Sequence, residues 1–155
     1  MTNLCCEVLE KLKGKTLVTA ESLTGGGIGA ALTAIPGSSE VYKGGIICYT
    51  NWVKQNVLGV PAEILETHGA VSRQTAVQMV SGVRKLLQAD VAVSVTGLAG
   101  PGGDEFGNPV GLVFIGYSEE GRTLSRRFLF SGDRDQVRSQ AVREALKLVL
   151  ELQNN

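Results

Sequence analysis

The chain has 155 residues, of which 43% are hydrophobic, enough to bury the core of one globular domain without disulfides or metal. Its 15 Lys and Arg residues balance 15 Asp and Glu residues, so no net positive field is available to hold nucleic acid or an anionic membrane surface. No apolar run approaches the ~20 residues of a membrane span, and the first residues do not form a signal peptide. We therefore expect a single cytoplasmic domain over residues 1–155.

The cysteine and histidine content limits the chemistry. Cys5 and Cys6 are adjacent and do not readily pair with each other, so together with Cys48 they form no disulfide framework. There is no Cys-x-x-Cys spacing, and His68 is the only histidine, which leaves no residues for a structural zinc site or a histidine-based triad. We expect neither a metal nor a cofactor. Cys48 lies inside an expected strand and is interpreted as a small buried hydrophobe.

The first part of the chain predicts strands that run into helices. Residues 4–13 carry apolar side chains at helical spacing and are followed by a short buried strand at 17–20. A glycine-rich turn then leads into a helix at 28–35. A second strand is expected at 44–50, and Asn51 is placed to cap a short helix after it.

The second part adds a strand, a hairpin and the remaining helices. These helices are expected at 61–67, 72–87 and 133–152. The apolar run at 90–96 predicts a central strand, and alternating segments at 110–117 and 123–130 predict a hairpin. This order of elements predicts an α/β fold, a three-layer α/β/α sandwich with a mixed, mostly parallel sheet that ends in an antiparallel hairpin.

The most informative segment is 19–27 (TAESLTGGG), where a strand gives way to a glycine-rich turn and a helix. The glycines remove side chains that would keep a ligand from the backbone, and the free amides of a helix start favour an anion or an oxyanion. The same residues also suit a plain helix cap, because Ser and Thr are preferred there. This segment alone leaves both interpretations open.

Polar residues follow several of the expected strands, and in an open α/β sheet ligands bind beyond the carboxyl ends of the strands. Without a suitable histidine, a nucleophilic Ser22 would need another base. Lys54 lies one helical turn beyond the strand end at Tyr49, where burial could lower its pKa enough to accept a proton. The alternatives are that Lys54 is one of many solvated lysines and that Tyr49 is only a half-buried residue at a strand end.

Two further features are compatible with an anionic ligand. Segment 96–103 (TGLAGPGG) has the glycine content of a backbone-lined anion loop, although a mobile connector has the same composition. Arg134 and Arg138 are four residues apart on one face of the last helix, which suits a phosphate but equally suits a solvated surface.

Taken in order along nearly the whole chain, these motifs resemble the CinA carboxy-terminal domain family, the nicotinamide-nucleotide amidohydrolases also called PncC. The matching motifs are TAESLTGG at 19–26, PGSS at 36–39, GG at 44–45, YTN at 49–51 with Lys54, GAVS at 69–72, SVTGLAGP at 94–101, PVG at 109–111 and GDR at 132–134. An ordered series of motifs is far more specific than any single glycine loop.

The resemblance implies an enzyme that deamidates nicotinamide mononucleotide to nicotinate mononucleotide and ammonia, in pyridine-nucleotide salvage. It implies Ser22 as nucleophile, Lys54 as base and Tyr49 as an assisting group, with backbone amides near the turn stabilising the oxyanion. The residues it implies for substrate binding are Glu21, Thr24, Gly25, Gly26, Thr96, Gly97, Ala99, Gly100, Arg134 and Arg138. A homodimer is also implied. The alternative function is a non-catalytic module that senses a nucleotide or binds a partner.

Overall fold

Five strands form one sheet in the order β2-β1-β3-β4-β5, in a computed structural model that describes residues 1–154. The strands are β1 (Leu17–Glu21), β2 (Tyr42–Ile47), β3 (Val91–Gly97), β4 (Leu112–Glu119) and β5 (Arg122–Leu129). β1 pairs in parallel with β2 and with β3, whereas β4 pairs antiparallel with β3 and with β5. The predicted mixed, mostly parallel sheet with an antiparallel hairpin at its end is confirmed.

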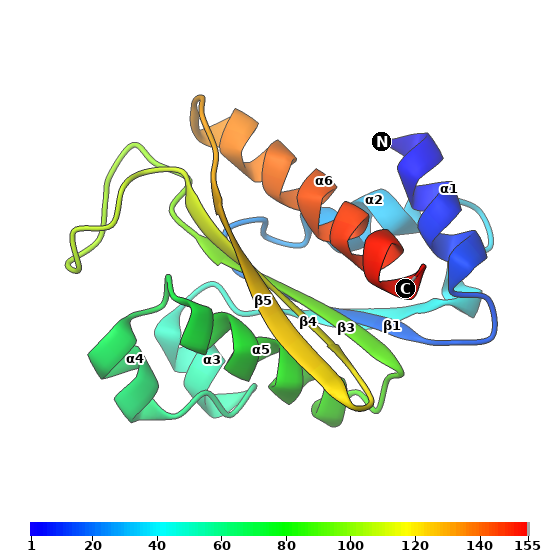
Figure 1. Cartoon of the computed structure of the whole chain (residues 1–155), viewed down its shortest axis with the longest axis horizontal. Coiled ribbons are helices and arrows are strands. Elements are labelled where there is room, and N and C mark those ends of the chain that lie inside the picture. Colours follow the sequence, from blue (N-terminus) through cyan, green and yellow to red (C-terminus); the bar gives the residue numbers. More distant parts are fainter. Residues whose placement is uncertain (155) are drawn as a thin grey trace.

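Helices cover both faces of this sheet, as the α/β/α prediction requires (Figure 1). One layer contains α1 (Thr2–Lys11), α2 (Gly27–Thr33) and α6 (Arg134–Gln153). The other contains α3 (Asn51–Asn56), α4 (Ala62–His68) and α5 (Arg73–Leu86). A short 3-10 helix, η1 (Ser38–Glu40), precedes β2. Within residues 1–154, no helix is both long enough and apolar enough to cross a membrane.

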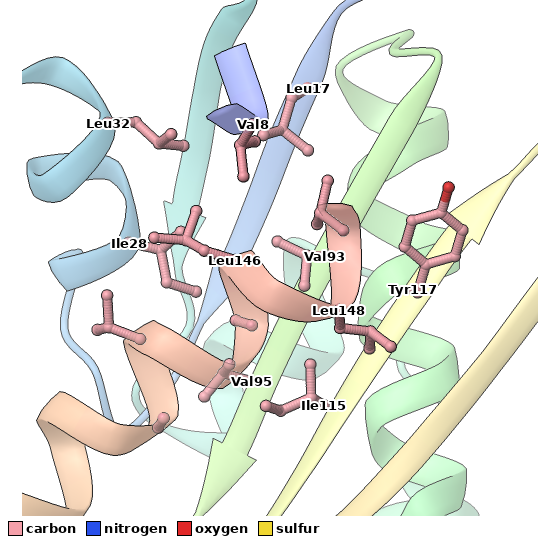
Figure 2. Close-up of a cluster of buried hydrophobic side chains, with 14 of the residues drawn as sticks. Val8, Leu17, Ile28, Leu32, Val93, Val95, Ile115, Tyr117, Leu146 and Leu148 are labelled. Atoms are coloured by element: carbon pink, nitrogen blue, oxygen red, sulfur yellow. The ribbon is translucent and has the colours of Figure 1, made fainter. Parts of the chain in front are cut away.

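Alternation along β1 sends successive side chains to opposite layers. Leu17 belongs to the apolar cluster beneath α1, α2 and α6, which also contains Ile28 and Leu146 (Figure 2). Val18 and Ala20 belong to the cluster beneath α5. Because the alternation continues to the end of β1, the Glu21 side chain points to the same face as that of Leu17.

Several boundaries differ from those predicted. The strand expected at 44–50 starts and ends earlier, as β2 over Tyr42–Ile47. The N-cap position of the next helix is Thr50 instead of Asn51, and the Thr50 side chain makes no capping hydrogen bond. Thr50 has extended backbone angles, φ −108° and ψ 160°, so the helical conformation begins only at Asn51. Ser72 caps α5, and Asp133 caps α6 through a capping box with Gln136.

Candidate active site

A cavity of about 520 Å³ lies where the carboxyl ends of β1 and β3 meet the loop after β2. Its walls come from the turn after β1, from α3, from the glycine-rich loop after β3 and from the start of α6. The predicted site residues that line it are Ser22, Tyr49, Lys54, Thr96, Gly97, Ala99, Gly100 and Arg134. The sheet order therefore brings together residues from four separate parts of the sequence.

Ser22 and Lys54 are in direct contact at the base of this cavity. Lys54 Nζ donates to Ser22 Oγ at 2.9 Å and to the carbonyl oxygen of Cys48 at 2.7 Å. The Lys54 side chain is only 1% exposed, although it lies on a short helix at the surface of the sheet. The interpretation of Lys54 as a solvated surface lysine is therefore wrong.

Lys54 is buried without a counter-charge, which lowers its pKa and favours the neutral amine that a base requires. None of the four ion pairs found among residues 1–154 involves this lysine. Loss of hydration disfavours the ammonium form, and burial accordingly lowers the pKa of Lys54 from its ordinary value. The neighbouring Cys48 thiol is buried, which raises its pKa to about 11, so it stays protonated at neutral pH. Ser22 is thus the nucleophile candidate at this position.

The turn after β1 presents Ser22 and leaves backbone donors beside it. Ser22 N–H still pairs with Val95, and its carbonyl accepts the Gly25 amide at 3.1 Å, which closes the turn. Gly25 and Gly26 have positive φ angles of 58° and 99°, which side chains rarely tolerate. In the hydrogen-bond network of residues 1–154, the amides of Leu23 and Thr24 have no acceptor. These two amides are available to an oxyanion.

Glu21 does not reach the cavity. Its side chain is 2% exposed and points to the opposite face of the sheet, where its carboxylate accepts from the Thr24 hydroxyl and from two amides of α2. Thr24, Gly25 and Gly26 are likewise absent from the cavity walls. The expected contact of the Glu21 side chain with substrate is corrected to a role in building the turn. Thr24, Gly25 and Gly26 build the same turn, and the Thr24 amide remains free.

The two arginines of α6 have separate partners. Arg134 lines the cavity, donating to the Gly100 carbonyl at 2.8 Å and to the Tyr49 hydroxyl at 3.2 Å. Arg138 lies outside it and donates to the carbonyls of Leu23 at 2.9 Å and Thr24 at 3.3 Å. Of the two arginines considered for a phosphate, only Arg134 therefore lies at the cavity, because Arg138 is engaged with the turn after β1.

The remaining predicted residues border the cavity in different ways. Tyr49 is 58% exposed and its hydroxyl contacts Arg134, not Ser22. Thr96 is buried, and its hydroxyl donates to the carbonyl of Ala70 at 2.7 Å. This hydrogen bond ties the end of β3 to the segment before α5. The glycine-rich loop is thus anchored at its base.

Sequence reasoning did not identify the distal wall of the cavity, which includes Asp104, Glu105 and Phe106. The Asp104 carboxylate accepts the backbone amides of Phe106 at 3.1 Å and Asn108 at 3.0 Å, which folds the loop back on itself. The Phe106 ring lies where a side chain on Gly69 would collide with it. An aspartate followed by an aromatic residue between glycines was the available signal for an ordered loop.

The described residues contain no cluster of three or more His, Cys, Asp and Glu side chains able to hold a metal ion.

The fold and the site together define an α/β protein with a buried serine–lysine pair at the carboxyl end of parallel strands. The profile of the CinA C-terminal domain matches residues 2–153, so the chain belongs to the CinA C-terminal domain family.

Relatives with known names support this assignment. A CinA-like protein of Thermosynechococcus vestitus is 50% identical over 138 residues, covering 87% of this chain and 33% of the relative. A CinA-like protein of Synechococcus sp. RCC307 is 47% identical over 151 residues, covering 95% of this chain and 36% of the relative. The chain thus spans about a third of the length of these curated relatives.

Solved structures match over nearly their full length. Competence damage-inducible protein A of Klebsiella pneumoniae superposes with a TM-score of 0.94 at 41% identity, covering 97% of this chain and 94% of that one. The competence/damage inducible protein CihA of Agrobacterium tumefaciens gives a TM-score of 0.94 at 42% identity, covering 99% of this chain and 95% of that one.

Proposed function

We propose that this chain is an amidohydrolase that converts nicotinamide mononucleotide to nicotinate mononucleotide and ammonia. The observation that carries the proposal is the contact of 2.9 Å between Lys54 Nζ and Ser22 Oγ, made by a lysine that is buried and has no carboxylate partner. A solely structural lysine is usually paired when it is fully buried. An unpaired lysine beside a serine hydroxyl is instead suited to general-base catalysis.

The first half of the reaction forms an acyl-serine. Neutral Lys54 accepts the proton of the Ser22 hydroxyl as Oγ attacks the carboxamide carbon, and the carbonyl oxygen becomes an oxyanion. The free amides of Leu23 and Thr24, in the turn that carries Ser22, are the backbone donors that we assign to it. Protonated Lys54 then returns its proton to the amide nitrogen, which leaves as ammonia when the carbon–nitrogen bond breaks.

The second half regenerates the enzyme. Lys54 accepts a proton from water as the water oxygen attacks the acyl carbon, and the same proton is then given to Ser22 Oγ when the ester bond breaks. The released acid keeps the second hydrogen of the water and loses it to solvent, which gives the nicotinate carboxylate. The cycle consumes one water for each ammonia released and uses the lysine alternately as base and acid.

Features of the cavity agree with a nucleotide substrate. Arg134 supplies a guanidinium at the cavity wall opposite the nucleophile turn, where it suits the phosphate of a mononucleotide. Tyr49 lies beside it with a largely exposed side chain and a hydroxyl free to donate. We assign Thr96, Gly97, Ala99 and Gly100 to the wall that holds the ribose.

The test is ammonia release from nicotinamide mononucleotide, measured with and without a chelator. Wild-type activity should survive chelation. Ser22→Ala should abolish it and Lys54→Ala should lower it about 10²- to 10⁴-fold, while the circular dichroism spectrum of both variants stays unchanged. Lys43→Ala is the matched control, because Lys43 is exposed and its Nζ only contacts the Gln88 carbonyl. Tight nucleotide binding by the wild type without any ammonia would instead support the sensing or partner-binding alternative.

A further inference from the structure

Only two of the buried side chains among residues 1–154 are normally charged, Glu21 and Lys54. Lys54 is the base of the proposed reaction, whereas the reaction scheme gives Glu21 no task. Burying a carboxylate costs free energy unless it is fully hydrogen-bonded, so its position immediately before the nucleophile needs a physical reason.

The Glu21 carboxylate gathers donors from both sides of the nucleophile turn. One oxygen accepts the Thr24 hydroxyl at 2.7 Å and the Ile28 amide at 2.8 Å. The other accepts the Gly29 amide at 3.0 Å and the Thr19 hydroxyl at 3.3 Å. Because the N-cap of α2 is Gly26, which has no side chain, Glu21 supplies the acceptor that a capping residue would otherwise provide.

The backbone of the same residue is tied to the base. The Glu21 carbonyl accepts the Cys48 amide at 2.9 Å, and the Cys48 carbonyl accepts the Lys54 ammonium at 2.7 Å. Glu21 therefore connects through its side chain to the turn that carries the nucleophile and through its main chain to the segment that orients Lys54.

We propose that Glu21 is a positioning residue, which fixes the turn from Ser22 to Gly26 so that the serine hydroxyl faces Lys54 and the Leu23 and Thr24 amides face the reacting carbonyl. This inference rests on the proposed amidohydrolase function. It assigns the buried carboxylate to the geometry of the turn and not to contact with substrate.

A carboxylate suits this position because all four of its contacts are donors. In Glu21→Gln, one oxygen becomes an NH₂ group that cannot accept, so at least one pair of these donors loses its acceptor. In Glu21→Asp, the chain is one methylene shorter and cannot keep both the Thr24 hydroxyl and the α2 amides. Both variants should let the turn shift while leaving the cavity walls intact.

The experiment compares kcat, KM and the pH–rate profile of wild type and Glu21→Gln. A displacement of about 1 Å at the reacting groups costs about 100-fold in rate, so we expect kcat to fall by roughly that factor. KM and the position of the rising limb of the pH profile should stay unchanged, since substrate contacts and Lys54 are untouched. A KM increase without a fall in kcat would overturn the proposal in favour of substrate binding.

Ser94→Ala is the matched control. The Ser94 hydroxyl is equally buried and donates to the Ala76 carbonyl at 2.8 Å, outside the cavity. Its loss should lower the melting temperature without changing kcat. If kcat fell equally in both variants at equal stability loss, the role of Glu21 would be structural only. Should Glu21→Gln not fold, Thr24→Val removes a single link to the carboxylate and should still lower kcat, whereas unchanged kcat would refute positioning.

A second readout separates this inference from the proposed function. A fluorophosphonate phosphonylates activated serines, because the serine oxygen attacks phosphorus and fluoride leaves. It should label wild-type Ser22 and should label Glu21→Gln about 100-fold more slowly. Equal labelling rates in the two proteins would overturn the positioning role. If wild type is labelled but releases no ammonia, the proposed substrate is wrong while the labelling ratio still decides the role of Glu21.

Discussion

The protonation state of Lys54 should control the rate of the reaction. Only the neutral amine can accept the Ser22 proton, so the rate should rise with pH through the pKa of Lys54 and level off above it. At its ordinary pKa of 10.5, about one lysine in a thousand would be neutral at pH 7.5. Burial lowers this pKa, and each pH unit of lowering multiplies the neutral fraction by about ten.

Lys54→Arg tests this dependence, because arginine keeps the positive charge but does not release its proton in proteins. Loss of a general base costs about 10²- to 10⁴-fold in rate, and we expect a loss in this range for Lys54→Arg and for Lys54→Ala alike. The assay is kcat/KM from ammonia release, measured from about pH 6 up to the ordinary lysine pKa of 10.5, so that a lowered pKa appears as a shift of the rising limb to lower pH.

Two results would refute the reasoning. A wild-type rate that does not vary with pH over this range would show that no titrating lysine takes part in the reaction. Substantial activity in Lys54→Arg would show that a charged side chain suffices at this position. Lys43→Arg is the control, since Lys43 is exposed and should keep the full profile.

Three further predictions concern stability and specificity. The folded-state pKa of Lys54 lies below the unfolded value of 10.5. The contribution of Lys54 to the free energy of unfolding is therefore complete above pH 10.5 and is lost as the pH falls through the folded-state pKa. In urea denaturation, the stability of Lys54→Met should depend less on pH in that window than the stability of the wild type. Arg134→Ala should raise KM for the mononucleotide about 10- to 100-fold, as expected for a lost charge-assisted contact, with little change for the unphosphorylated nucleoside in steady-state kinetics. Gly82→Ala should lower the melting temperature in calorimetry, because its Cβ would collide with the Leu58 carbonyl. The collision costs about 1–3 kcal/mol, which offsets the helix-propensity gain of about 1 kcal/mol. An unchanged or higher melting temperature would contradict the collision.

The sequence predicts the elements well because its local signals agree. Apolar periodicity and the glycine-rich turns indicate the same helices and strands that the structure contains. Ser22 and Lys54 are 32 residues apart, however, and their contact depends on β1 lying beside β2 in the sheet. Local patterns do not determine which strands are neighbours, so the sequence could suggest the Ser22 and Lys54 pair but only the three-dimensional structure shows their contact.

The orientation of Glu21 could have been predicted from the sequence, whereas the partners of Arg138 could not. The period of two along β1 places Glu21 on the same face as Leu17 and Thr19, and therefore on the face opposite Ser22. The resemblance implies that Glu21 binds substrate, but this alternation turns its side chain away from the cavity. The partners of Arg138 had no such signal, because helical spacing places it beside Arg134 but does not indicate that the Leu23 carbonyl lies within reach.

The separation of the two buried charges explains how a lysine can serve as a base here. A carboxylate within about 4–6 Å of Lys54 would favour the ammonium form and remove its ability to accept a proton. Glu21 is next to the nucleophile in sequence, yet strand alternation turns it to the opposite face, where amides and hydroxyls satisfy its charge. The carboxylate therefore stabilises the turn without contributing to the ion pairs of residues 1–154. The same alternation that orients Ser22 toward Lys54 thus keeps Lys54 unpaired, and the two requirements of the site follow from a single feature of β1.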